Sequence, residues 1–277
     1  MPDPAARGGR FALVALVLFW SLAPMVWQLY SSFRTPEALL AGGQGFGSGW
    51  TLANYRQVLG GEPPFWRYLL NSTLVGAVTT ALTLGLAIPC AYALRRGGAR
   101  LRGWVSGLLL AAAVVPYVLV VLALLELARQ FGLANNLLAL SLPYAGLSMP
   151  MAVLLLLAAF SGLPPELEES AVLEGLGVAQ RLRWILLPLL GPGLVSTAIL
   201  VFLFSWNEFP IALTWLSRSE LLTLAPAMAR IAGSSVFTVP YGAFAAATVL
   251  GGMPLLLLLL LSQRQIVSGL TQGAVKG

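Results

Sequence analysis

The chain has 277 residues, of which 58% are hydrophobic and only 9% are charged. Soluble globular domains carry about 25% charged residues, so the composition excludes that class and favours a protein with several membrane-spanning helices. The net charge of +6 forms no basic stripe and histidine is absent from the sequence, so we expect neither nucleic-acid binding nor catalysis by this chain alone.

Six apolar runs are long enough to cross a membrane, because a spanning helix needs about 20 residues. They cover residues 11–33, 68–94, 104–127, 137–160, 185–216 and 241–262. The sequence therefore predicts an all-α polytopic membrane protein with one transmembrane domain of six helices. The first run is too long for a signal peptide and lacks a small-x-small cleavage site, so we expect it to be retained as a helix.

The segment 34–67 is the longest polar connection, and it ends in a short amphipathic stretch near residues 52–59. It can be a flexible hairpin with an interfacial helix or a docking surface for a partner. Most of the apolar runs also contain proline, and Pro116 is expected to kink the third run because it removes a backbone donor. Kinked helices can surround a transport cavity, but ordinary helix packing in membranes also tolerates proline.

The distribution of basic residues predicts the orientation. Arg95, Arg96, Arg100 and Arg102 follow the second run, which indicates a cytoplasmic end. With the N-terminus inside, ten of the 16 Lys and Arg residues fall on the cytoplasmic side and six outside. We therefore expect the N-in, C-in topology, with 34–67 extracytoplasmic and both 163–184 and the tail 263–277 cytoplasmic.

The segment 163–188 is a charged insert between two membrane-length runs. Four of the ten acidic residues of the chain lie within nine positions of it, namely Glu166, Glu168, Glu169 and Glu174. Pro164 and Pro165 suit the start of a helix, Gly175 suits its end, and residues 178–187 can begin a second helix. On a helical wheel the acids share no single face, which suggests contacts on several sides and leaves open which of them touch a partner.

The spacing within this insert is specific. Glu169-Ser170-Ala171, three residues, Gly175, nine residues and then Ile185-Leu186-Leu187-Pro188 resemble the EAA loop of ABC importer permeases. Ser170 replaces the usual middle alanine of that motif, and Glu174 replaces an aspartate that is common in sugar permeases.

Further motifs narrow the resemblance to carbohydrate permeases of the MalG type and extend it over most of the chain. These are Asn71-Ser72-Thr73-Leu74-Val75 with Ala91-Tyr92-Ala93-Leu94, Gly132-Leu133-Ala134-Asn135, Trp206-Asn207-Glu208-Phe209, and the ending Gly269-Leu270-Thr271-Gln272-Gly273-Ala274-Val275-Lys276-Gly277.

The resemblance implies the type I ABC importer permease fold and a heteromeric importer in the bacterial inner membrane. The implied partners are a homologous second permease, two copies of a cytoplasmic ATPase and an extracytoplasmic sugar-binding protein. ATP and Mg would be bound by the ATPase, and no cofactor or metal by this chain. The residues implied to couple to the ATPase are Glu166, Glu169, Ser170, Ala171, Glu174, Gly175, Leu187 and Pro188. The tail residues implied to contact it are Thr271, Gln272 and Lys276.

Four residues are candidates for the substrate pathway: Asn71, Trp206, Asn207 and Glu208. Glu208 is the most unusual of them, because a charge at bilayer depth costs about 2.5–3.5 kcal/mol on insertion scales and should face a cavity or a partner. A purely structural pairing near the outer boundary is the equal alternative. Glu126 and Arg129 are expected to form an interfacial i,i+3 pair.

Other functions fit the sequence less well. The chain has no glycine-rich phosphate loop, so it is not itself the motor. An intramembrane enzyme would need convergent acid, base or metal ligands, and a secondary transporter would usually show internal repeats and more ion-coupling residues. An importer permease for a non-sugar solute, such as glycerol phosphate, remains an alternative, and the sequence does not identify the solute.

Overall fold

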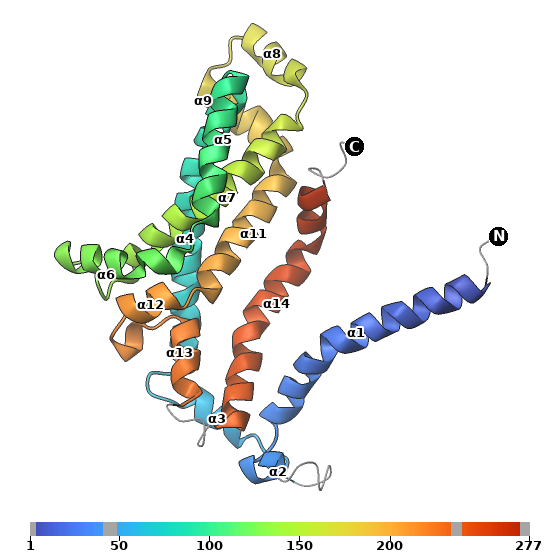
Figure 1. Cartoon of the computed structure of the whole chain (residues 1–277), viewed down its shortest axis with the longest axis vertical. Helices are drawn as coiled ribbons and strands as arrows, with labels where there is room; N and C mark the ends of the chain where they lie inside the picture. The colour runs from blue at the N-terminus through green and yellow to red at the C-terminus, as the bar shows by residue number, and fades with distance from the viewer. Residues whose placement is uncertain (1–3, 41–48, 234–239, 272–277) are drawn as a thin grey trace. The chain divides into compact units, whose positions relative to one another are not determined.

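The computed structural model describes residues 4–40, 49–233 and 240–271 of the chain. These residues are mostly helical and contain one isolated antiparallel bridge, between Arg34 and Trp50, but no longer strand. The all-α class expected from the sequence is therefore confirmed. In chain order the helical elements (Figure 1) are α1 (Pro4–Ser32), α2 (Pro36–Leu40), α3 (Ala53–Leu59), α4 (Phe65–Arg96), α5 (Ala99–Val114), η1 (Tyr117–Val120), α6 (Val121–Gln130), α7 (Leu137–Ser161), α8 (Pro165–Leu173), α9 (Val178–Arg181), η2 (Leu182–Leu186), α10 (Leu187–Leu189), α11 (Gly191–Asn207), α12 (Pro210–Trp215), η3 (Ser219–Leu221), α13 (Leu224–Ile231) and α14 (Tyr241–Thr271).

Four helices are long and apolar enough to cross a membrane: Leu13–Ser32, Phe65–Arg96, Leu137–Ser161 and Tyr241–Gln263. Two further pairs of helices meet this criterion only together, and each pair is sharply bent. By length and composition, the described part of the chain thus holds four candidate spans, or up to six if each bent pair is one span.

The third apolar run breaks rather than kinks. Its two halves, Ala99–Val114 and Tyr117–Gln130, are bent by 79°. Val115 has an extended backbone (φ −63°, ψ 125°), because the ring of a following proline disfavours the helical conformation of the residue before it. Pro116 also lacks the N–H that a continuous helix would need.

The fifth run, expected as one helix over 185–216, is divided into several elements. Its bend of 84° lies between the segments Val178–Leu189 and Gly191–Asn207. A second interruption separates Asn207 from α12, where Phe209 precedes Pro210 and Pro210 opens the new helix. The run expected over 185–216 contains Pro188, Pro192 and Pro210, and in the structure these prolines lie at the starts of α10, α11 and α12.

By internal packing the chain divides into two units, Met1–Arg67 with Ala227–Pro254 and Tyr68–Pro226 with Leu255–Gly277. In the first unit, the amide of Asn54 in α3 donates to the carbonyl oxygens of Ser32 and Arg34, each at 2.9 Å. A Cβ at Gly242 would lie 2.5 Å from the Asn54 amide nitrogen, so a larger residue there would displace the side chain that makes these bonds. The amphipathic stretch near residues 52–59 is confirmed as a short helix, α3.

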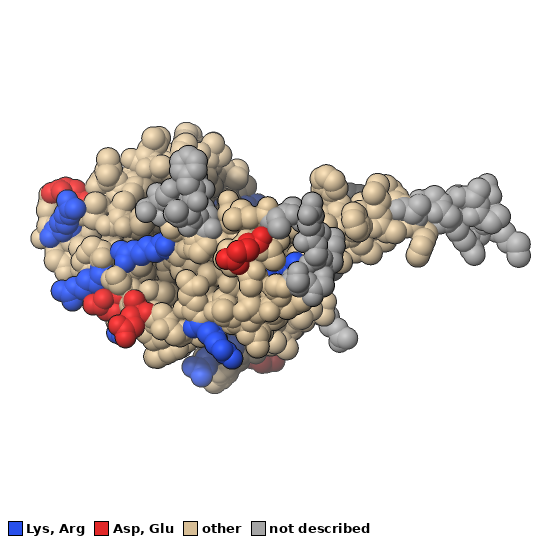
Figure 2. All heavy atoms as spheres, turned by 90° about the horizontal axis from the view of Figure 1, so that it is seen from below, with Lys and Arg blue, Asp and Glu red and all other residues tan. Residues whose placement is uncertain are grey.

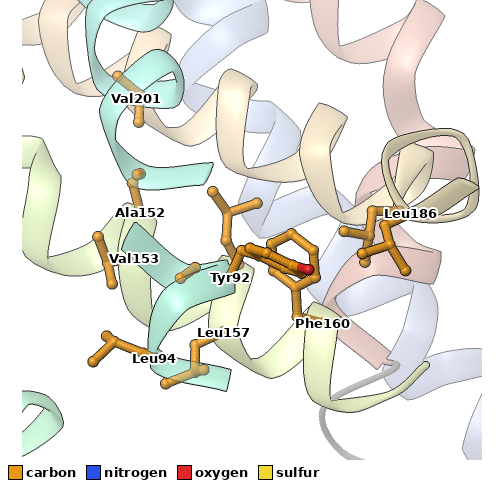
Figure 3. Packing of buried hydrophobic residues seen from close by; sticks show 12 residues of the cluster. Tyr92, Leu94, Ala152, Val153, Leu157, Phe160, Leu186 and Val201 are labelled. Carbon is orange, nitrogen blue, oxygen red and sulfur yellow. The ribbon is translucent and has the colours of Figure 1, made fainter. Parts of the chain in front are cut away.

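The second unit contains the main apolar core, in which α7 packs against both α5 and α11. Buried apolar side chains recur along α4 and α7 at helical spacing, so that one face of each helix is turned toward the core. Figure 3 shows this cluster, in which the ring of Tyr92 lies beside that of Phe160 with their centroids 5.9 Å apart. The core residues are Ala87, Ala91, Tyr92, Leu94, Ala152, Val153, Leu156, Leu157, Phe160, Leu186, Leu190 and Val201.

Within this unit, α8 and α9 lie at one end of the long helices, and α6 and α12 lie toward the other (Figure 1). In the view of Figure 2, acidic and basic side chains form only small groups on a surface made mostly of other residues. That surface matches the low charge content of the sequence.

Candidate functional site

The charged insert folds as the helix α8, and local sequence signals explain where it begins. Pro164 precedes the helix and Pro165 opens it, where a missing N–H costs little because the first N–H groups have no intrahelical partner. Glu166 and Glu168 lie in the first turn, where carboxylates interact favourably with the positive end of the helix dipole. The predicted helix start is confirmed.

The end of α8 is a Schellman motif centred on Gly175. The Leu176 N–H donates to the Ala171 carbonyl oxygen at 3.0 Å, and the Gly175 N–H donates to that of Val172 at 2.9 Å. Gly175 has φ +79°, in the left-handed region that glycine adopts without cost. The predicted termination at Gly175 is therefore confirmed, with its hydrogen bonds identified.

A second helical segment begins at Val178, as the sequence predicted. The side chain of Gln180 accepts a hydrogen bond of 2.8 Å from the Gly177 N–H, which caps α9. The chain then continues through the π-helical turn η2 into α10, which contains Leu187 and Pro188. Leu186 is fully buried in the core, Leu187 is half-buried and Pro188 is exposed, so this end of the motif attaches the insert to the apolar core.

The residues of α8 divide into an inner and an outer side. Ala171 is 2% exposed and the Glu168 side chain is 14% exposed, and their three-residue spacing places both toward the rest of the unit. On the outer side, Leu173 is 89% exposed, an unusual state for a large apolar side chain on a charged helix. The exposed candidates within α8 and directly after it are Glu166, Glu169, Ser170, Glu174 and Gly175. The wheel, in which the acids shared no face, had indicated contacts on several sides, whereas the chain itself covers one side of α8.

Glu168 is the acid on the inner side, and it joins three elements. One carboxylate oxygen, Oε1, accepts a hydrogen bond from the hydroxyl of Tyr92 in α4. The same oxygen lies 3.7 Å from Nε of Arg96 and 3.9 Å from Nη1 of Arg181 in α9. We refer to Glu168, Tyr92, Arg96 and Arg181 as the Glu168 junction.

The two arginines of the junction differ in burial. The Arg181 side chain is 7% exposed, whereas that of Arg96 is 49% exposed and also stacks 5.8 Å from the ring centre of Tyr92. Arg95 provides a further link, because its Nη2 donates to the Leu163 carbonyl oxygen at 3.1 Å, just before α8. An open cavity of about 270 Å³ beside the junction is lined by Arg95, Arg96, Pro165, Glu168, Glu169, Val172 and Arg181.

Glu208, a candidate for the substrate pathway, is engaged in local structure. Its carboxylate accepts from the N–H groups of Ile211 and Ala212 at 2.9 and 3.0 Å, and from the hydroxyl of Tyr144. The residue is 3% exposed. The carboxylate thus caps α12 across the break at Pro210, which favours the structural alternative for this residue.

The other three pathway candidates differ from Glu208 in burial and in their hydrogen bonds. Asn71 donates to the carbonyl oxygens of Glu220 and Leu222 at 3.0 and 2.8 Å. Trp206 is buried, whereas Asn207 is exposed and donates to the carbonyl of its own helix at Leu203. Asn71 therefore holds the connection after α12 in place.

Two further expectations concern polar contacts and the tail. Glu126 accepts a hydrogen bond from Gln130 at 3.1 Å, and within the described ranges it forms no ion pair with Arg129, so the expected i,i+3 pair is not observed. α14 runs to Thr271, beyond the expected end at 262; Gln272 and Lys276 lie outside the described residues. Over residues 4–40, 49–233 and 240–271, no three His, Cys, Asp or Glu side chains are arranged to hold a metal ion.

Comparison with known proteins decides the family. Residues 83–272 match the family of binding-protein-dependent transport system inner membrane components. The chain belongs to this family. It is therefore an inner-membrane component of an ABC transporter.

The similarity to curated relatives covers nearly the whole length of the permease. A sulfoquinovosyl glycerol transport system permease protein of Agrobacterium fabrum is 34% identical, over 97% of this chain and 93% of the relative. A trehalose transport system permease protein of Mycobacterium tuberculosis is 35% identical, over 99% of both chains. A chain of a bacterial ABC transporter involved in the import of alginate has a TM-score of 0.78 at 19% identity, over 95% of this permease and 98% of that chain, which supports the type I permease fold.

Sequence reasoning missed Glu168 as a site residue of the permease, together with its partners. Glu168 lies one position before the EAA motif, and Tyr92 lies 76 positions earlier in the chain. The excess of arginine after the second run and of glutamate in the insert was a usable signal, since opposite charges expected on one side of the membrane can pair.

Proposed function

We propose that this chain is a permease subunit of an ATP-driven importer and forms half of the translocation pathway for a carbohydrate. The observation that carries the proposal is the similarity, over nearly the full length, to permeases named for sugar or sugar-glycoside transport. An extracytoplasmic binding protein would deliver the solute, in accordance with the description of the family.

The assembly that we propose contains this chain, a homologous second permease, two copies of an ATPase and the binding protein. This chain would be non-catalytic and hold no cofactor, and the ATPase would bind ATP and Mg. The absence of a glycine-rich phosphate loop from the sequence supports this division of roles. The tail residues Thr271, Gln272 and Lys276 would contact the ATPase.

The orientation that we propose is N-in and C-in, with α8 on the cytoplasmic side. Arg95 and Arg96 in the last turn of α4, with Arg100 and Arg102 in α5, support this orientation through the positive-inside rule. In this orientation the outer side of α8 is available to a cytoplasmic partner. Leu173 would enter an apolar pocket of the ATPase, and the exposed carboxylates Glu166, Glu169 and Glu174 would pair with basic residues around it.

The physical requirement for coupling is a difference in affinity. Binding at α8 shifts the helices of the permease only if the ATPase binds one arrangement of α8 more tightly than another. A change in the ATPase on ATP binding would supply that difference. Ser170, Ala171, Gly175, Leu187 and Pro188 would keep α8 in the form that the ATPase recognises, through its packing, its end and its attachment to the core.

Reconstitution in liposomes tests the proposal. The permease is assembled with its second permease, ATPase and binding protein, and uptake of labelled trehalose, maltose, chitobiose and glycerol phosphate is measured with internal ATP. We expect uptake of at least one sugar, dependent on ATP and on the binding protein. Sugar uptake that continues with an ATPase unable to hydrolyse ATP would contradict the proposal, and uptake of glycerol phosphate alone would contradict the carbohydrate assignment.

A further inference from the structure

The connections of α8 to its neighbours in sequence are short and contain glycine. Gly162 lies with Leu163 and Pro164 between α7 and α8, and Gly175 and Gly177 lie between α8 and α9. Glycine has the least restricted backbone, so connections of this kind can absorb a movement instead of passing it on. If only the peptide chain held α8, a displacement of α8 would change the backbone dihedral angles of these glycines and would not move the neighbouring helices.

Noncovalent contacts fasten α8 to the end of α4 at two points. At the N-terminal side, Arg95 donates to the carbonyl oxygen of Leu163. About one turn into the helix, the carboxylate of Glu168 accepts from Tyr92 and lies beside Arg96 and Arg181. Two separated points of attachment fix the direction of a helix as well as its position, whereas one point would leave it free to turn.

The burial of the two arginines indicates which contact of the Glu168 junction is the stronger one. Arg181 is nearly enclosed, at 7% side-chain exposure, so it depends on the Glu168 carboxylate for its compensating charge. Arg96 is half-exposed, and water screens its attraction to Glu168. The connection that resists separation is therefore the one from Arg181 through Glu168 to the Tyr92 hydroxyl, which spans α9, α8 and α4.

The junction also connects directly to the apolar core. The ring of Tyr92 packs against Phe160 near the end of α7, and Leu186 follows Arg181 in the same helical segment and is fully buried. Close-packed cores transmit displacement because they contain little free volume. A displacement of Glu168 therefore reaches α4, α7 and η2 without passing through the glycine connections.

We propose that Glu168 is the positioning residue that joins α8, the end of α4 and the end of α9 into one rigid body. A movement that the ATPase imposes on α8 then displaces α4 directly. This inference rests on the proposed function, because it assigns the route by which that movement enters the membrane helices. It separates two roles within one short helix, since the exposed acids contact the partner and the inner acid transmits the movement.

The test compares Glu168→Gln with the unaltered permease in the complete reconstituted importer. Glutamine keeps the length of the side chain and an oxygen that can accept from Tyr92, but removes the charge that holds Arg181. Three quantities are measured: the amount of ATPase that copurifies, the rate of ATP hydrolysis, and the number of sugar molecules taken up per ATP hydrolysed. Glu126→Gln is the matched control, an exposed glutamate on α6 that bonds only to its helical neighbour Gln130 among the described contacts.

We expect Glu168→Gln to retain the ATPase and to hydrolyse ATP within about twofold of the unaltered complex. Uptake per ATP should fall at least about fivefold, the low end of typical coupling between sites. The exchange of charges in Glu168→Arg with Arg181→Glu should restore part of the lost uptake per ATP. The Glu126→Gln control should keep the ratio of the unaltered complex.

An unchanged ratio in Glu168→Gln would overturn the inference while leaving the proposed function intact. If the unaltered complex itself shows no ATP-dependent uptake, the proposed function fails instead, so the two failures are distinguishable. If Glu168→Gln does not assemble, Tyr92→Phe decides the question, because it keeps the ring on Phe160 and removes only the hydroxyl. A ratio that is unchanged in Tyr92→Phe would overturn the inference in the same way.

Discussion

The substitution Gly175→Ala, at the end of α8, is the sharpest test of the proposal that α8 couples the permease to the ATPase. Gly175 has φ +79°, and a Cβ built on it meets no atom within 4 Å. Alanine there would clash with nothing, so its only cost is the backbone conformation. The variant therefore isolates the left-handed turn that closes α8 from every question of side-chain packing.

The magnitude follows from that conformation. An L-residue pays about 1–2 kcal/mol in the left-handed region, because its Cβ approaches the following carbonyl oxygen. A cost of 1.4 kcal/mol changes an equilibrium constant tenfold, so the closed end of α8 should lose about one order of magnitude in population relative to frayed forms. The hydrogen bonds at risk are those from Gly175 to Val172 and from Leu176 to Ala171.

The assay measures copurification of the ATPase and ATP-driven uptake in liposomes. Gly175→Ala should lower both, and Gly175→Asn should lower them less, because asparagine tolerates the left-handed region better than alanine. Gly132→Ala is the matched control: Gly132 has φ +66°, ends α6 in the same motif and also has no atom within 4 Å of a built Cβ. Equal losses in Gly175→Ala and Gly132→Ala, or no loss in Gly175→Ala, would refute this reasoning.

Substitutions at three further positions test the packing of the second unit by thermal unfolding of the purified permease in detergent. Gly76→Ala places a Cβ 2.7 Å from the ring of Phe202 and should lower the free energy of unfolding by about 1–3 kcal/mol. Adding Phe202→Leu to Gly76→Ala should recover part of this loss, and a melting temperature of Gly76→Ala equal to that of the unaltered permease would contradict the close contact. Asn71→Asp replaces a donor amide with a carboxylate that faces two carbonyl oxygens. It should lower the melting temperature more than Asn71→Ala does, and the reverse order would contradict the two hydrogen bonds of Asn71. Glu208→Gln removes one acceptor from the cap of α12 and should cost about 1–3 kcal/mol, and an unchanged melting temperature would argue against that cap.

Local signals in the sequence predicted local structure well. The ends of α8 follow from Pro165 and Gly175, whose backbone preferences act without help from distant residues. The helices of the apolar runs were equally predictable from the sequence, because a membrane-spanning helix depends on its length and hydrophobicity more than on specific partners. The interruptions within them were harder, since a proline weakens a helix but the packing around it determines whether the chain bends slightly or by 79°.

The roles of single charged residues could not be read in the same way. Glu208 stood out as a charge within an apolar run, whereas Glu168 was only one of four acids in the insert. Each gains its role from a distant partner, Tyr144 for Glu208 and Tyr92 for Glu168. For Glu208 a local signal existed, because an acceptor two residues before Pro210 is placed to cap a new helix. For Glu168 only the pairing of charges between segments far apart in sequence pointed to the junction.

The polar clamps on the connection after α12 constrain the order in which the permease is made. Asn71 and Ser72, near the start of α4, bond to residues about 150 positions later in the chain. α4 enters the membrane long before those residues are synthesised, and its amide and hydroxyl groups must first be satisfied by water, the insertion machinery or neighbouring helices. Contacts of such long sequence separation form late. The second unit therefore completes its packing only when most of the chain has left the ribosome, and truncated chains ending before residue 220 should be early substrates for membrane quality control.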